Sequence, residues 1–204
     1  MVYQKPSDYL VNFIKEHYKE YGKVTEYKKY SNDTKIKGNV KTTSLNFRCK
    51  FEKSDQTVYE KLIFVETADG EFLIKALIYS SKQWFIDDYD SFIEKSEETA
   101  QKYYEINENE TYSKLAGILD DKDLAELFEE VINDRVEYYG KTTKHSLLST
   151  SAILKDDQPI VIQRYECETD QNMTVYEEFW FVRIGEEFLI NDYYYAGTLE
   201  ALDE

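Results

Sequence analysis

Apolar residues recur at three- and four-residue spacing in two stretches of the chain, and each stretch ends at a glycine. This spacing places the apolar side chains along one face of a helix. We predict one helix from near Pro6 to Gly22 and another from near Asp123 to Gly140, with each glycine as the C-cap. The apolar positions are Leu10, Phe13, Ile14, Tyr18 and Tyr21, then Leu124, Leu127, Phe128, Val131, Ile132, Val136 and Tyr139.

After each glycine the pattern changes to runs of β-branched and aromatic residues that short polar turns separate. Such runs predict strands, and the polar turns predict hairpins. Each half of the chain is therefore expected to form an antiparallel meander of four strands. The expected strands are 23–31, 40–52, 57–67 and 71–80, then 141–154, 159–168, 173–184 and 187–196, with hairpin loops at 53–56, 68–70, 169–172 and 185–186.

Short segments of the first half recur in the second half in the same order. The sequence of residues 57–60 returns at 174–177, and that of residues 71–74 returns at 187–190. The Tyr-Gly-Lys that ends the first predicted helix also ends the second. The offset stays near 117 residues throughout, which an internal duplication with one-residue loop changes would produce.

An additional helix is expected between the two copies. Ser91 and Glu94 suit a capping box at its start, so we predict this helix over residues 91–105. No counterpart precedes residue 6. The predicted fold class is therefore α+β: two tandem copies of a helix packed on a four-stranded antiparallel meander, with an extra connecting helix. The predicted units are residues 1–82 and residues 83–204. The second unit begins with the leading helix 91–105, and the first unit lacks a counterpart of that leading helix.

A helix on a curled four-stranded sheet, used twice, resembles the nuclear transport factor two-like, or cystatin-like, superfamily, in particular small bacterial domains of unknown function. The likeness rests on helices that end in Tyr-Gly, on strands of the type Thr-Val-Tyr-Glu, and on the hairpin sequence Asp-Gly-Glu-Phe-Leu-Ile. It implies a cone-shaped fold that hosts isomerases, dehydratases, transport adaptors and many non-catalytic modules. The function then depends on which side chains the fold displays.

The net charge narrows the classes of function. The chain has 25 Lys+Arg against 41 Asp+Glu, a net charge of −16, which argues against binding nucleic acid or an anionic membrane. No run reaches the roughly 18 apolar residues of a membrane span, and no nucleotide-binding or hydrolase motif occurs. We expect no membrane insertion, no cofactor and no catalytic residue. If an N-terminal segment was removed from this chain, we expect an extracytoplasmic location.

The excess of acidic residues lies in the second half of the chain. Residues 1–94 carry 15 basic and 15 acidic side chains, whereas residues 95–204 carry 10 and 26. We expect the second copy to bind a basic protein, with steering by its carboxylates and anchoring by its tyrosines. Inhibitors and immunity proteins of basic enzymes or toxins are often built in this way, and we expect a non-enzymatic monomer of this kind. The partner-binding residues we predict are Glu126, Glu129, Glu130, Asp134, Glu137 and Tyr138.

Solubility alone is the alternative explanation of the acidic half. A second hypothesis for function places a small apolar ligand, or isomerase- or dehydratase-like chemistry, in the cone of the second copy, around Tyr139, Trp180, Asp192 and Tyr194. Asp192 interrupts an otherwise apolar strand, and a buried carboxyl beside Tyr194 would suit a general base. The competing interpretation is that the alternation slips near the strand end and leaves Asp192 in water.

An arginine and a glutamate also recur in the two halves. We expect cross-strand ion pairs, Arg48 with Glu60 and Arg164 with Glu177, that fix the strand register, in preference to a charged site in each copy.

The remaining titratable residues give no metal or thiol site. His17 matches Arg135 and His145 matches Tyr27 in the repeat, so the two histidines do not converge and we expect no metal site. Cys49 and Cys167 are expected to be free core thiols at different positions of their strands.

Overall fold

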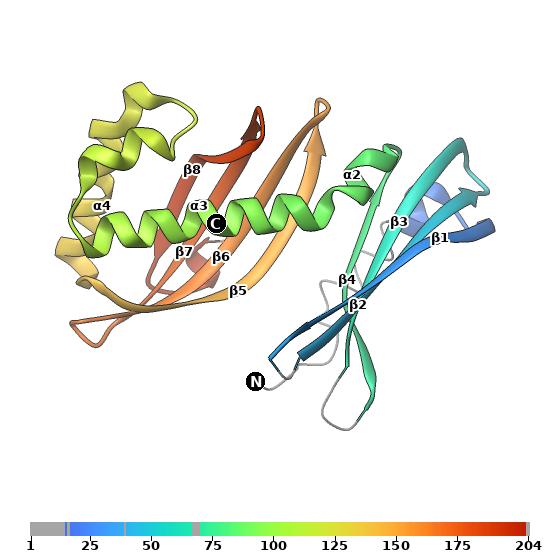
Figure 1. Ribbon diagram of the computed structural model, residues 1–204, viewed down its shortest axis with the longest axis horizontal. Helices are drawn as coiled ribbons and strands as arrows, with labels where there is room; N and C mark the ends of the chain where they lie inside the picture. Colours follow the sequence, from blue (N-terminus) through green and yellow to red (C-terminus); the bar gives the residue numbers. More distant parts are fainter. Residues whose placement is uncertain (1–14, 16, 39, 67–69, 203–204) are drawn as a thin grey trace. The chain divides into compact units, whose positions relative to one another are not determined.

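The computed structural model describes residues 15, 17–38, 40–66 and 70–202. They form two four-stranded antiparallel sheets, each packed with helices, so the fold class is α+β (Figure 1). The chain divides into two compact units, Met1–Asp88 and Tyr89–Glu204. The predicted α+β class is confirmed.

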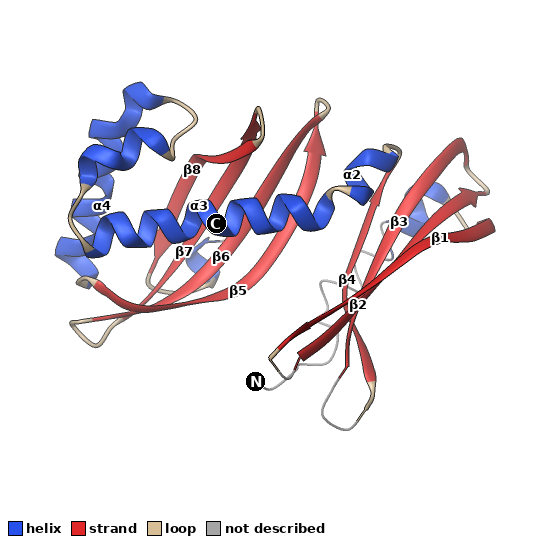
Figure 2. Cartoon of the chain, in the orientation of Figure 1, coloured by secondary structure: helices blue, strands red, loops and turns tan. Residues whose placement is uncertain are grey.

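The first unit contains a meander of strands in the order β1-β2-β3-β4. Helical residues end at Tyr21 before the first strand, and the short helix α2 follows the last. Buried Cys49, Phe51 and Val58 form its central cluster. The elements are β1 (Val24–Lys37), β2 (Val40–Phe51), β3 (Ser54–Glu66), β4 (Phe72–Ser80) and α2 (Gln83–Asp87) (Figure 2).

The second unit contains the meander β5-β6-β7-β8, and the long helix α3 runs across one face of this sheet (Figure 1). The strands are β5 (Thr142–Lys155), β6 (Gln158–Thr169), β7 (Thr174–Ile184) and β8 (Glu187–Ala196). The helices are α3 (Tyr89–Glu108), α4 (Ala125–Tyr139) and three short 3₁₀ segments, Tyr112–Gly117, Lys122–Leu124 and Glu200–Leu202.

Alternation along the strands explains which face of the second sheet is covered. On β6, every second residue is buried, including Val161, Gln163, Tyr165 and Cys167. Residues of α3 at helical spacing, among them Tyr103, are buried against the sheet. Because successive strand residues point to opposite faces, one face forms the core with α3 and the other is left to more polar side chains.

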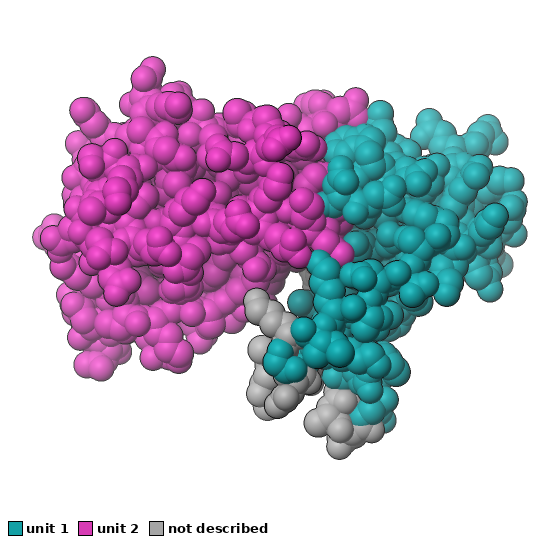
Figure 3. Space-filling view, viewed as in Figure 1, with its two compact units in different colours: residues 1–88 teal, residues 89–204 magenta. Residues whose placement is uncertain are grey.

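The first unit ends at Asp88, directly after the short helix α2. Figure 3 colours this unit teal and the second unit magenta. The sequence predicted the unit boundary between residues 82 and 83, which would place α2 in the second unit. In the structure α2 belongs to the first unit. The helix predicted over 91–105 is α3, which begins earlier, at Tyr89. Ser91 therefore lies inside the first turn of the helix and is not its N-cap.

Strand bounds differ from the prediction mainly in the first sheet. Strand β1 continues to Lys37, beyond the predicted end at residue 31, because the polar segment Ser31–Thr34 still pairs with β2. Strand β3 begins at Ser54, so the predicted loop 53–56 is a tighter turn. The predicted start of the first helix near Pro6 and the loop residues 68–69 lie outside the described part of the chain.

Two glycines close equivalent turns in the two units. Gly22 and Gly140 have φ of 77° and 89°, a region that L side chains rarely adopt. Each follows a helix, and the adjacent hairpin packs against it: a Cβ on Gly140 would lie 2.3 Å from Asp170 Oδ1. The C-caps predicted at both positions are therefore confirmed, with close approach of a neighbouring hairpin as a second reason for glycine.

Candidate functional site

The predicted partner-binding residues form an acidic face on helix α4. Four of them follow one another at four-residue intervals, and Glu137 lies beside the last of the four. Glu126, Glu130, Asp134, Glu137 and Tyr138 are exposed, and Glu129 is half-buried. None of the five carboxylates takes part in an ion pair with another described residue. We call these six residues the α4 acidic face.

Apolar side chains accompany this acidic face. Leu127 is 56% exposed and Tyr138 is 70% exposed. The opposite side of the helix faces the core through Phe128, Ile132 and Arg135: Phe128 contacts the ring of Tyr193, and the other two are buried. An exposed mixture of carboxylates and large apolar groups is typical of a protein-binding surface, in which charge guides association and apolar groups supply the binding energy.

An open pocket of about 580 Å³ lies at the C-terminal end of α4. Its lining joins residues from this helix to Tyr195 on β8, which lies far away in the sequence. The ring centroids of Tyr139 and Tyr195 are 6.0 Å apart with nearly perpendicular planes. We call this the tyrosine pocket; it is lined by Asp134, Glu137, Tyr138, Tyr139 and Tyr195.

Three of the four residues predicted to bind a small ligand do not face the interior of the second unit. Trp180 is the cross-strand partner of Asp192, and Tyr194 is the partner of Glu178. The buried Phe179, by contrast, is the partner of Tyr193, whose ring contacts Tyr103 of α3. Alternation along the strands therefore places Trp180, Asp192 and Tyr194 together on the face opposite α3.

A register shift on β8 explains this placement. Between Ile190 and Asp192 the pairing with β7 skips Asn191, so a β-bulge reverses the alternation at this point. Tyr193 faces inward as a result, while Tyr194 is 49% exposed. The interior is filled by aromatic rings, namely Tyr103, Tyr104, Tyr165, Phe179 and Tyr193. The alternation therefore slips near the strand end, as the competing interpretation has it, and Asp192 itself is half-buried on the face opposite α3.

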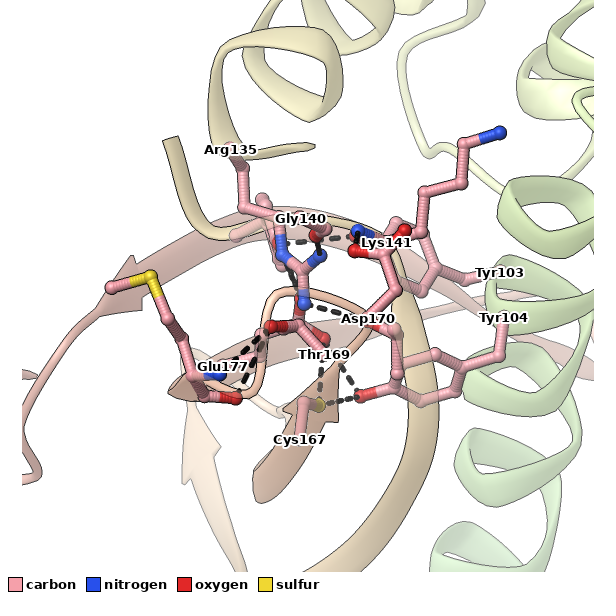
Figure 4. A network of polar contacts seen from close by, with 12 residues as sticks. Tyr103, Tyr104, Arg135, Gly140, Lys141, Cys167, Thr169, Asp170 and Glu177 are labelled. Carbon is pink, nitrogen blue, oxygen red and sulfur yellow. Dashed lines mark hydrogen bonds and ion pairs between the residues drawn. The ribbon is translucent and has the colours of Figure 1, made fainter. Parts of the chain in front are cut away.

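The centre of the second unit contains a buried ion pair that the sequence did not predict (Figure 4). Arg135 Nε lies 2.9 Å from Glu177 Oε1, and both side chains have no exposed surface. The two Nη atoms of Arg135 donate to the Gly140 carbonyl oxygen and the Thr142 hydroxyl, each at 2.6 Å. The guanidinium therefore connects the end of α4 to β5 and β7.

Hydroxyl groups from two other elements complete the surroundings of Glu177. Tyr104 of α3 donates to Oε2 at 2.8 Å, and Tyr193 of β8 donates to Oε1 at 2.9 Å. The Cys167 thiol lies 3.4 Å from Oε2. Burial and the nearby Glu177 charge raise the pKa values of both tyrosines and of Cys167. The hydroxyls and the thiol thus stay protonated and donate to the carboxylate, an arrangement that stabilises the unit.

The first unit has a corresponding cluster around Glu60. His17 Nε2 lies 2.9 Å from Glu60 Oε1, and Cys49 Sγ lies 3.3 Å from Oε2. Burial and the Glu60 charge raise the pKa of Cys49 to about 12. Both cysteines are buried free thiols, as predicted. Their positions were predicted to differ, which is wrong, because Cys49 pairs with Val58 and Cys167 with Val175, two residues that match in the repeat.

The predicted cross-strand ion pairs are wrong in their partners. Arg48 is opposite Tyr59, and Glu60 is opposite Phe47, so Arg48 and Glu60 point to different faces. Arg164 forms its ion pair with Glu178, through its Nε and the Glu178 Oε2 atom. This pair lies on the face of the sheet opposite the one that carries Glu177.

A signal for the true partners was present in the sequence. His17 matches Arg135 while Glu60 matches Glu177, which places one nitrogen-bearing side chain and one carboxylate at equivalent points of each copy. The interpretation of an internal duplication rests on these matching positions and on the shared strand order.

Among the described residues, no group of three or more His, Cys, Asp or Glu side chains is arranged to hold a metal ion. In the same part of the chain, no helix has both the length and the apolar character needed to cross a membrane.

Comparison with known proteins gives one distant structural likeness to report. No protein-family model matches the sequence, and no curated protein matches it significantly. Among solved structures, the chain is similar to a protein described as "Ntf2 like protein involved in plasmid conjugation", with 10% identity, a TM-score of 0.31, and coverage of 97% of this chain and 92% of that chain. The α+β class of this chain rests on the two sheets described above.

Proposed function

We propose that this chain is a non-enzymatic protein-binding module that engages a basic protein through the α4 acidic face, in the manner of an inhibitor or immunity protein. The observation that supports it is the display of five carboxylates that form no ion pair with a described residue, beside the exposed side chains of Leu127 and Tyr138. A helix surface used only for solubility gains nothing from large exposed apolar groups.

The charge distribution within α4 adds to this argument. Arg135 is the only basic residue of the helix, and its charge is fully buried against Glu177. The outward side of α4 therefore presents negative charge alone. Such a surface accelerates association with a positively charged partner by about 10- to 1,000-fold at low ionic strength, and the effect weakens as salt screens the charges.

The test is a charge reversal confined to α4. Proteins retained from an extract of the source cells by the immobilised chain are identified by mass, and the retained basic protein is purified. Its association rate is then measured against the unmodified chain and against Glu126→Lys/Glu130→Lys. We expect the double variant to associate at least about tenfold more slowly at low salt, with a smaller difference at high salt.

A matched control separates the surface from the net charge. Glu98→Lys/Glu108→Lys makes the same change in charge at exposed positions of α3, and its association rate should stay within about twofold of the unmodified rate. Equal slowing by both double variants would show a nonspecific effect of net charge, and the absence of any retained basic protein would also contradict the proposal.

A further inference from the structure

The tyrosine pocket has the chemistry of a cation-binding site. Building on the proposed function, we propose that this pocket accepts an arginine side chain from the basic protein that docks on α4. The pocket continues the α4 acidic face, because Asp134, Glu137 and Tyr138 belong to both. A segment of the partner that follows the helix would therefore reach the pocket without leaving the surface.

The aromatic rings of the pocket are available to a cation. The ring centroids of Tyr138 and Tyr139 are 4.7 Å apart at an interplanar angle of 63°, and Tyr139 and Tyr195 are nearly perpendicular. These angles turn the ring faces in different directions around one space. Guanidinium groups stack on tyrosine faces within about 6 Å of the ring centroid.

The carboxylates of the pocket supply the opposite charge. Asp134 and Glu137 are separated by one helical turn on the same side of α4, and both are exposed. Neither is paired with a described basic residue, because the neighbouring Arg135 points inward to Glu177. Burial and, secondly, the charge of Asp134 raise the pKa of Tyr195, so the negative field of this carboxylate extends to the tyrosine wall.

The combination favours arginine over other occupants. A guanidinium donates two parallel hydrogen bonds to a carboxylate while its plane stacks on a ring, whereas an ammonium makes only point contacts. An apolar group would remove two carboxylates from water without compensation, and an anion would be repelled. The pocket, at about 580 Å³, has room for the side chain together with part of the segment that carries it.

The experiment uses three short peptides that differ only in a central arginine, lysine or citrulline, each titrated into the isotope-labelled full chain and followed by NMR. Citrulline keeps the shape of arginine but lacks its charge. We expect the arginine peptide to bind at least about fivefold more tightly than the lysine peptide and the citrulline peptide to show no saturable binding. The shifted amide signals should be those of residues 134–139 and 195. An equal affinity for the three peptides, or shifts elsewhere, would overturn the proposal.

Variants locate the binding and separate a protein-borne arginine from a free one. Asp134→Asn/Glu137→Gln and Tyr138→Ala should each remove the preference for arginine over lysine, whereas Glu126→Gln/Glu130→Gln, on the same helix but outside the pocket, should retain it. Arginine amide alone should bind more weakly than the peptide, and equal binding of the two would indicate a site for the free molecule and contradict a role in partner docking.

The two proposals fail separately in these experiments. If charge reversal on α4 slows association but the pocket variants keep their arginine preference, the arginine site is wrong and the protein-binding surface stands. If the arginine peptide binds in the pocket while Glu126→Lys/Glu130→Lys leaves association unchanged, the α4 surface is wrong.

Discussion

Replacement of the buried Glu177 by glutamine should strongly destabilise the second unit. The change removes the negative charge but leaves the guanidinium of Arg135, which has no exposed surface, without a counter-charge. Removing one partner of a buried ion pair costs about 3–5 kcal/mol, because the remaining charge stays desolvated. For a loss of about 4 kcal/mol and an m-value of about 1.5 kcal/mol/M, the urea midpoint should fall by about 2.7 M.

The two tryptophans allow each unit to be followed separately. Trp84 belongs to the first unit and Trp180 to the second, so in a Trp84→Phe background the fluorescence change in urea reports the second unit. Glu177→Gln is measured in this background, beside Glu168→Gln as the matched control. Glu168 lies on the neighbouring strand and pairs with Lys144, but both side chains are more than half exposed, so we expect no resolved change in the midpoint.

A third variant gives an intermediate test. Tyr193→Phe removes one hydroxyl that donates to Glu177 and keeps both charges, and it should cost about 1 kcal/mol. The reasoning predicts the order Glu177→Gln, then Tyr193→Phe, then Glu168→Gln, from largest to smallest effect. A midpoint for Glu177→Gln that equals the one for Glu168→Gln would show that the buried charge does not control stability.

Three further predictions follow from the turns, the histidines and the thiols. Gly140→Ala should cost about 1–2 kcal/mol more than Gly185→Ala in urea unfolding, because both glycines have positive φ but only at Gly140 would a Cβ collide with the adjacent hairpin; equal costs would remove the collision argument. Burial lowers the pKa of His145 below its ordinary value of 6.5, so the unfolded chain takes up the proton first and stability should fall as the pH drops below about 6.5, more steeply in the unmodified protein than in His145→Gln. Cys49 and Cys167 are buried with raised pKa values, so at pH 8 iodoacetamide should modify them in urea within minutes and leave the native protein unmodified, as measured by mass; rapid modification of the native protein would contradict their burial.

The fold was predictable because its local signals agree with its tertiary packing. Alternating apolar residues give the strands of the second sheet to within about two residues, and the glycines after both helices are required by positive φ. The errors arise where tertiary contacts override local composition. The polar segment Ser31–Thr34 reads as a turn, yet it extends β1 because β2 supplies cross-strand partners along its whole length.

The candidate site was predictable only in part, for geometric reasons. The α4 acidic face follows from helical spacing, since exposed positions recur every three or four residues. The contribution of Tyr195 to the pocket depends on β8 meeting the end of α4, which no local pattern contains. Asp192 could not be assigned to a face from the sequence, because a single skipped residue, Asn191, reverses the alternation beyond it.

The buried cluster and the exposed surface of α4 are two consequences of one charge arrangement. The helix carries a single cation, Arg135, and the fold buries it where the Gly140 carbonyl and the Thr142 hydroxyl accept hydrogen bonds from its two Nη atoms and the Glu177 carboxylate supplies the opposite charge. Had this arginine faced outward, it would lie beside Asp134 and neutralise part of the acidic face. The inward ion pair therefore fixes the end of α4 against the sheet and leaves the outward carboxylates uncompensated, so the same contact that stabilises the unit also sets the negative charge that a basic partner would meet.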